Sequence, residues 1–200
     1  MSSIDSGNST PRLLVFAGPN GSGKSSITVK LPTVGLYVNA DDIKRERRCS
    51  DLEAAQEAER IRHMLLAAKK DFTFETVLST TRNLELIRSA KQAGYHIMAV
   101  FVLTKDPAVN VERVHQRAAA GGHTVPEEKI ISRYYKSLEH LSTLVRIADI
   151  TRIVDNTGAL PELICQVEGD RVQVTEGSCW KKNEILALLT RKQDQSTQLP

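Results

Sequence analysis

The chain has 200 residues, of which 40% are hydrophobic and 26% charged, an ordinary composition for one globular domain. A net charge of +3 and only 4% aromatic residues argue against a nucleic-acid surface or a base-stacking platform. No run approaches the ~20 apolar residues that a membrane span needs. Three cysteines without a close pair favour a reducing compartment. We therefore expect a cytoplasmic protein without nucleic-acid or membrane partners.

Strand-like and helix-like apolar patterns alternate along most of the chain. Short apolar runs predict strands at 13–17, 35–38, 72–77, 96–103 and 150–154. Helical periods and capping residues predict helices at 24–31, from 50 or 51 to 68, 83–94, 106–120 and from about 124–126 to 147. The basic run Lys44, Arg45, Arg47 and Arg48 is expected to be a solvated loop. This alternation predicts an α/β fold with a mainly parallel, five-stranded sheet between two helix layers.

Residues 18–25 read GPNGSGKS and match the phosphate-binding pattern G-x-x-x-x-G-K-[ST]. The motif follows an apolar strand and opens a helix, where backbone N–H groups and the helix dipole attract phosphate oxygens. An ordinary glycine-rich turn would not require Lys24 and Ser25 at these positions. We predict that Lys24 reaches the β- and γ-phosphates and that the Ser25 hydroxyl holds Mg²⁺. The predicted nucleotide-binding residues are Gly18, Pro19, Asn20, Gly21, Ser22, Gly23, Lys24, Ser25 and Ser26.

The rest of the sequence narrows the kind of phosphate-loop protein. It contains no N/T-K-x-D element for guanine recognition and no apolar strand ending in the usual magnesium-binding aspartate. A small kinase remains, which needs an acceptor site and a group to accept the proton of the acceptor hydroxyl. Asp41 and Asp42 follow the second strand, where a ligand is expected, although a surface helix-capping pair fits equally well. Glu75 and Thr76 end the third strand, and Glu75 could instead be a solvated or salt-bridged acid.

Arginines flank the Gly121–Gly122 break between two predicted helices. Arg113 and Arg117 are four residues apart and can point the same way, and Arg133 follows the break. Such a helix pair suits a lid over residues 113–133 that neutralises charge on the transferred phosphoryl group. The alternative is a solvated helix face.

Together these motifs resemble the zeta-toxin family of P-loop kinases. The elements are GPNGSGKS, then NADDIK, then FET, then R-x-x-x-G-G-H-x-V-P with an arginine seven residues after the proline. The resemblance implies the strand order 2-3-1-4-5 and phosphorylation of a UDP-sugar such as UDP-N-acetylglucosamine, with ATP or GTP and Mg²⁺. It implies Asp41 as the base, Glu75 and Thr76 as substrate contacts, and Arg117 and Arg133 as lid arginines, with Arg113 as a further candidate for the lid. We also expect Arg113 to contact the substrate. It also implies a separate antitoxin partner.

One element departs from the family pattern. The E-G-T-G-R stretch of the family reads ETVLS at residues 75–79, which leaves its arginine without a counterpart before Arg82. The identity of the acceptor therefore stays open, and alternatives are a kinase of a nucleoside, a sugar or an antibiotic such as chloramphenicol, or a non-catalytic ATP-binding regulator. We expect disordered or flexible tails at 1–11 and 193–200 around a kinase core at 12–160. A hairpin and helix at 161–192 are expected to belong to the same domain.

Overall fold

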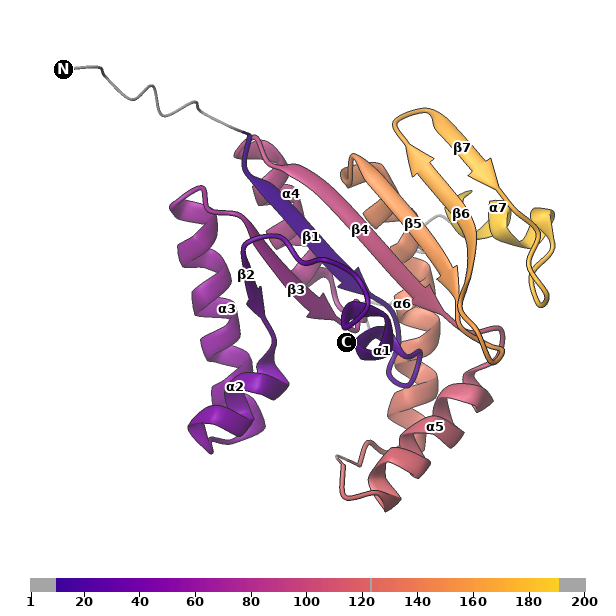
Figure 1. The fold of residues 1–200 in the computed structure, drawn as a ribbon, viewed down its shortest axis with the longest axis horizontal. Helices are drawn as coiled ribbons and strands as arrows, with labels where there is room; N and C mark the ends of the chain where they lie inside the picture. Colours follow the sequence, from indigo (N-terminus) through magenta and orange to yellow (C-terminus); the bar gives the residue numbers. More distant parts are fainter. Residues whose placement is uncertain (1–9, 123, 191–200) are drawn as a thin grey trace, which may run out of the picture.

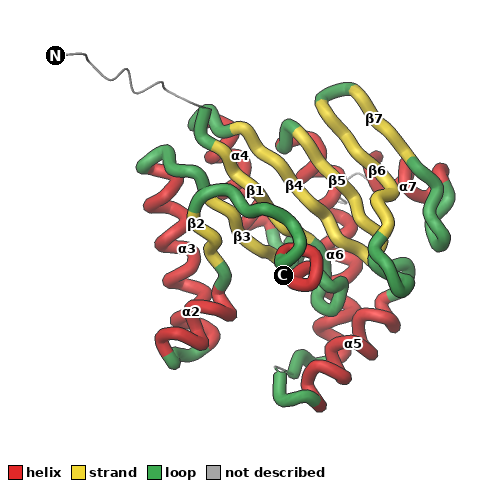
Figure 2. Tube along the Cα trace, viewed as in Figure 1, coloured by secondary structure: helices red, strands yellow, loops and turns green. Residues whose placement is uncertain are grey.

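The computed structural model describes residues 10–122 and 124–190 of the chain. Within them, seven strands form one sheet in the order β2-β3-β1-β4-β5-β6-β7 (Figures 1 and 2). The strands are β1 (Arg12–Ala17), β2 (Leu36–Val38), β3 (Phe72–Thr76), β4 (His96–Leu103), β5 (Ile150–Asp155), β6 (Glu162–Glu168) and β7 (Arg171–Val174). The helices are α1 (Lys24–Thr28), α2 (Ala40–Arg47), α3 (Asp51–Ala67), α4 (Thr81–Gln92), α5 (Pro107–Ala119), α6 (Glu127–Ile147) and α7 (Lys182–Thr190).

Parts of three sequence predictions lie outside the described residues. These are the tail at 193–200, all of the tail at 1–11 except its last two residues, and position 123 within the predicted lid. Among the described residues, no helix is both long and apolar enough to cross a membrane.

The first five strands are parallel, and their predicted order is confirmed. The expectation of five strands is wrong, because the C-terminal hairpin joins the same sheet. Strand β6 pairs antiparallel with β5, and β7 pairs antiparallel with β6. Strand β5 would otherwise present unpaired backbone groups at the edge of the sheet, so the hairpin covers an edge that parallel strands leave open.

Side chains alternate across the sheet and divide the core in two. Along β1, Leu13, Val15 and Ala17 belong to the larger cluster, which includes buried residues of α3, α4, α6 and α7. Leu14 and Phe16 face the other way and pack with Ile27 of α1. Figure 1 shows α4 and α6 on one face of the sheet and α1 on the other. Because β1 is buried from both sides, the loop that follows it starts from a rigid base.

The basic run after β2 is a helix, so the expectation of a loop there is wrong. Asn39 caps α2, its side chain accepting a hydrogen bond from the backbone N–H of Asp41. Acidic residues occupy the first turn of α2, and Lys44, Arg45 and Arg47 occupy its last turn. Both ends therefore complement the helix dipole, which compensates for the absence of buried residues in α2.

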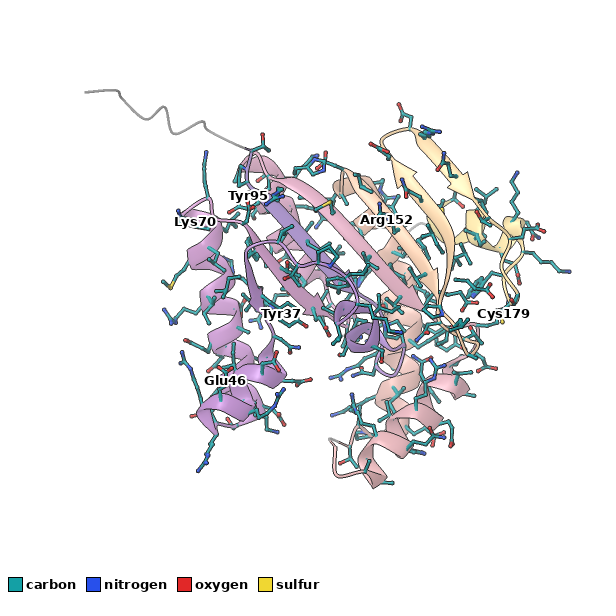
Figure 3. All side chains as sticks on the ribbon, viewed as in Figure 1. Tyr37, Glu46, Lys70, Tyr95, Arg152 and Cys179 are labelled. Atoms are coloured by element: carbon teal, nitrogen blue, oxygen red, sulfur yellow. The ribbon has the colours of Figure 1, made fainter. Side chains whose placement is uncertain are left out.

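Helix α3 is fixed at both ends beside β2. Ser50 and Glu53 form a capping box at its start. At its other end, the hydroxyl of Tyr95 lies 3.0 Å from the carbonyl oxygen of Leu65 in the last turn and 2.9 Å from that of Lys70 just after the helix. Figure 3 labels Tyr95 and Lys70 at this end of the sheet, away from the phosphate loop. These contacts hold α3 in a fixed position beside the sheet and next to the site.

Candidate active site

The GPNGSGKS segment forms a tight loop between β1 and α1. Gly18 has φ +141°, and a Cβ at this residue would lie 2.0 Å from the carbonyl oxygen of Val102. Gly23 caps α1 with φ +87°. Only glycine tolerates both positions, which explains their place in the motif. The ammonium of Lys24 donates to the carbonyl oxygens of Gly18 and Pro19 at 2.7 and 2.9 Å, so it lies across the loop.

Two asparagines outside the motif hold the loop from behind. The amide of Asn110, on α5, donates to the carbonyl oxygen of Asn20 at 2.5 Å. The amide of Asn156, just after β5, donates to the carbonyl oxygen of Ser22 at 2.8 Å. Sequence reasoning missed both residues, because the motif does not indicate which distant residues will contact the loop. The position of Asn156 directly after a buried strand is the signal that could have found it.

Glu75 ends β3 and is held by three hydroxyl groups. Thr28 Oγ1 donates to its Oε1 at 2.8 Å, and the hydroxyl of Tyr37 donates to the same oxygen at 2.5 Å. Ser25 Oγ donates to Oε2 at 3.3 Å. Burial and the adjacent Glu75 carboxylate raise the pKa of Tyr37, so this phenol stays protonated and keeps donating. Glu75 thereby joins β3, α1 and β2, and Figure 3 labels Tyr37 at this junction.

A cavity of about 470 Å³ opens at the carboxyl ends of the parallel strands. Most predicted side chains line it, namely Lys24, Ser25, Ser26, Asp41, Glu75, Thr76, Arg113 and Arg117, together with Asn20, Gly21 and Gly23 of the loop. Gly18, Pro19, Ser22 and Arg133 do not line it. Figure 1 shows α2 and α3 on one side of this region and α5 on the other. The structure thus brings together residues from five separate elements.

Within the aspartate pair, the two side chains have different surroundings. Asp41 lines the cavity, whereas Asp42 does not and forms an ion pair with Arg45. This geometry favours Asp41 as the residue available to a bound ligand. Sequence position alone could not distinguish them, because both occupy the first turn of α2.

Arg113 has a structural role in addition to lining the cavity. Its guanidinium donates to the carbonyl oxygens of Asn156 and Thr157 at 2.7 and 3.3 Å, which fixes the segment after β5. A second cavity of about 280 Å³ lies beside this segment, lined by Gly23, Ser26, Ile27, Lys30, Arg113, Asn156, Gly158, Ala159 and Pro161. It borders the phosphate loop on the side of α1.

One residue of the larger cavity was not predicted from the sequence. Arg62 of α3 lines this cavity.

Comparison with known proteins places these features in a family. The zeta toxin family model matches residues 2–161. The chain belongs to the zeta toxin family. A curated relative, an uncharacterised protein of Haemophilus influenzae, is 24% identical over 129 residues, which cover 62% of this chain and 92% of the relative.

Solved structures related to this zeta toxin family member have the same fold. A chain of the AvrRxo1-ORF1:-ORF2 complex with ATP has a TM-score of 0.67 and 16% identity, covering 94% of this chain and 66% of that one. A chain of the PezAT toxin–antitoxin system of Streptococcus pneumoniae has a TM-score of 0.51 and 15% identity, covering 74% and 68%. Against two AvrRxo1 structures, our chain spans 61% and 66% of the matched chain. The fold is that of a P-loop kinase.

The phosphate-loop lysine of this zeta toxin family member lies among opposing charges. Burial lowers the pKa of Lys24 to about 8 from 10.5. The carboxylates of Glu75 and Asp41 oppose this change, and the guanidinium of Arg117 adds to it. Because a lysine must be protonated to attract phosphate, the charge of this residue depends on pH in the mildly alkaline range.

We predict that nucleotide affinity falls as pH rises above about 8. The free protein loses the Lys24 proton there, while bound phosphates restore it, so binding takes up a proton. Calorimetric titration with ATP at about pH 7.5 and about pH 9, in buffers of different ionisation heat, should show greater proton uptake and weaker binding at the higher pH. The Lys24→Arg variant, charged at both pH values, is the control. Equal affinity of the wild type at both pH values would contradict the prediction.

Proposed function

We propose that this protein is a kinase that transfers the γ-phosphoryl group of ATP or GTP to a hydroxyl of a UDP-activated amino sugar. The observation that carries the proposal is the convergence of Lys24, Asp41, Glu75 and Arg117 on one cavity beside a phosphate loop. Membership of the zeta toxin family supports the same reaction class. The second cavity, next to Gly23 and Asn156, is the proposed position of the nucleoside of the donor.

Each residue has a distinct task in the proposed reaction. The loop N–H groups and Lys24 bind the donor phosphates, and Asp41 accepts the proton of the acceptor hydroxyl. The hydroxyl oxygen then forms a bond to the γ-phosphorus while the bond from that phosphorus to the β–γ bridging oxygen breaks. The nucleoside diphosphate leaves with that electron pair. Arg117 and Arg113 neutralise the charge that develops on the transferred group.

The residues around Ser25 fit a magnesium ion. Its hydroxyl lies 3.3 Å from a carboxylate oxygen of Glu75, and this pairing of hard oxygen donors is one that Mg²⁺ accepts. Ser25 would hold the ion, with Glu75 orienting that hydroxyl. When bound, Mg²⁺ would neutralise charge on the β- and γ-phosphates. Glu75 therefore has a role beside the donor, in addition to the acceptor contact that the sequence predicts.

A separate antitoxin is the partner we propose. PezAT of Streptococcus pneumoniae is a chromosomal toxin–antitoxin system. Family membership and this fold likeness support a similar arrangement here. Because the candidate donor site opens at the carboxyl edge of the sheet, a partner covering that edge would prevent nucleotide binding.

An acceptor screen tests the proposed reaction. Purified protein with Mg²⁺ and ATP or GTP is incubated with UDP-N-acetylglucosamine, a nucleoside, chloramphenicol and neutral sugars, and products are identified by mass spectrometry. We expect one added phosphoryl group on the UDP-sugar. Phosphorylation of a nucleoside or an antibiotic alone would replace the acceptor. Tight ATP binding without turnover of any acceptor would favour a regulator.

A further inference from the structure

Arg62 is a cavity-lining cation to which neither the sequence motifs nor the proposed reaction gives a role. It lies on α3 and lines the larger cavity. Its guanidinium carbon lies 5.0 Å from the centroid of the Phe74 ring. Its Nε is buried without a hydrogen-bond partner, and the structure gives its guanidinium no hydrogen bond to any described residue. The residue as a whole is half-buried, and burying even one guanidinium N–H without a partner is costly.

Neighbouring charges do not satisfy this group. Glu59 lies on the same helix and attracts Arg62, but its Oε1 lies 3.2 Å from Nε of Arg82 and 4.0 Å from Nε2 of His63. The carboxylate of Glu59 is therefore shared with Arg82, whose charge in turn repels that of Arg62. The charge of Arg62 is thus only partly compensated by Glu59.

Arg62 lies on the side of the cavity where the acceptor is expected to bind. Lys24, Arg113 and Arg117 reach the cavity from α1 and α5, where the donor phosphates are expected. Arg62 reaches it from α3, as Asp41 does from α2, and these two helices lie together in Figure 1. Stacking on Phe74 restrains the plane of the guanidinium. A restrained guanidinium matches the oxygen geometry of a phosphate better than that of a neutral hydroxyl.

We propose that Arg62 binds a phosphate group of the acceptor and thereby selects phosphorylated or nucleotide-linked acceptors over neutral ones. This inference rests on the proposed kinase function and concerns the acceptor half of the same site. The UDP-sugar proposed above carries such a group, whereas a free sugar or chloramphenicol does not.

The test measures binding without turnover. The donor site is first saturated with Mg²⁺ and a non-hydrolysable ATP analogue, and UDP or inorganic phosphate is then titrated calorimetrically. Arg62→Met should weaken UDP binding by about 10- to 100-fold, the effect of losing charge-assisted hydrogen bonds to a phosphate. Arg62→Lys, which keeps the charge but not the planar fork, should lie in between. The salt dependence of binding should be reduced in Arg62→Met.

Arg60→Met is the matched control. Arg60 lies two residues away on the same helix but is exposed and pairs with Glu57, so the same change should leave UDP binding unaltered. Thermal unfolding of each variant identifies any that fails to fold, in which case Arg62→Lys carries the test.

The outcomes separate this inference from the proposed function. UDP binding that depends on Arg62, without phosphorylation of any UDP-sugar, would remove the proposed acceptor and leave the phosphate site standing. Equal UDP affinity in the wild type and Arg62→Met would overturn the inference. The inference would also be overturned if the donor-saturated wild type failed to bind UDP or phosphate. Equally efficient phosphorylation of N-acetylglucosamine and UDP-N-acetylglucosamine would overturn it as well.

Discussion

Replacing Asp41 by asparagine is expected to lower the acceptor-dependent rate by ~10²–10⁴-fold, the usual contribution of a general base. The change removes the proton acceptor but keeps the size of the side chain. Asp41 lines the cavity from the first turn of α2, opposite the arginines of α5. In the described part of the chain Asp41 makes no hydrogen bond to the phosphate loop, and its charge only helps to keep Lys24 protonated, so ATP affinity should change far less than the rate.

The neighbouring aspartate is the matched control for this variant. Asp42→Asn makes the same chemical change one residue away, at a side chain that pairs with Arg45 and does not line the cavity. It should retain nearly full activity, with a stability loss of at most ~1 kcal/mol from the lost helix-dipole and ion-pair effects. Both variants are compared by initial rates with the acceptor that the screen identifies. Full activity in Asp41→Asn, or equal losses in both variants, would remove Asp41 as the base.

The phosphate loop was predictable because its requirements are local. Three glycines with positive φ, a lysine that spans the loop and a following helix all lie within a few consecutive residues. The same holds for β1 and β4, whose uninterrupted apolar runs mark strands buried on both faces. Helix α2 was missed for the opposite reason. It buries no residue, so its apolar period is absent, and only its capping asparagine and charge pattern signal it.

The remainder of the site depends on contacts between residues distant in sequence. Glu75 receives hydrogen bonds from Thr28 and Tyr37, which are 47 and 38 residues away. No spacing rule links these positions, because the sheet order 2-3-1 brings them together. Arg62 was missed because arginine on a long polar helix normally faces solvent, and its burial depends on Phe74 of the adjacent strand β3.

The three arginines of the predicted lid have different surroundings in the structure. Arg113 and Arg117 line the cavity from α5, as their four-residue spacing implies, while Arg133 lies on α6 and does not line it. Spacing within one helix is a dependable guide to a shared face. The relation between two helices across a glycine break is set by tertiary packing, which sequence spacing does not encode. The catalytic role of Arg133 stays a prediction.

Replacing Lys24 by methionine is expected to abolish phosphoryl transfer, with a loss of at least ~10³-fold, while leaving the fold intact. Cationic groups on the transferred phosphate typically contribute this much to the rate. The ammonium is held at the loop at a cost: a pKa lowered from 10.5 to about 8 corresponds to a destabilisation on the order of 3 kcal/mol at neutral pH. The folded state disfavours the charged form, so this destabilisation is present below about pH 8 and is relieved between about pH 8 and 10.5.

Methionine removes that cost and also the two hydrogen bonds from Lys24 to the carbonyl oxygens of Gly18 and Pro19. Each such bond contributes about 1.5–3 kcal/mol when the donor is charged, so the two bonds together offset the destabilisation at neutral pH or exceed it by up to ~3 kcal/mol. We therefore expect the free energy of unfolding of Lys24→Met near pH 7 to equal that of the wild type or to be lower by up to ~3 kcal/mol. Since only the wild type gains stability between about pH 8 and 10.5, the difference in its favour should widen there. Denaturant unfolding across this range, alongside the kinase assay, measures both effects.

Two outcomes would contradict the prediction. Retained activity would show that Lys24 does not act on the phosphates. A pH dependence of unfolding free energy parallel to that of the wild type would show that the Lys24 ammonium is solvated. Loss of transfer together with diverging stability curves would show that catalysis requires the charge of Lys24 even though burying that charge destabilises the fold.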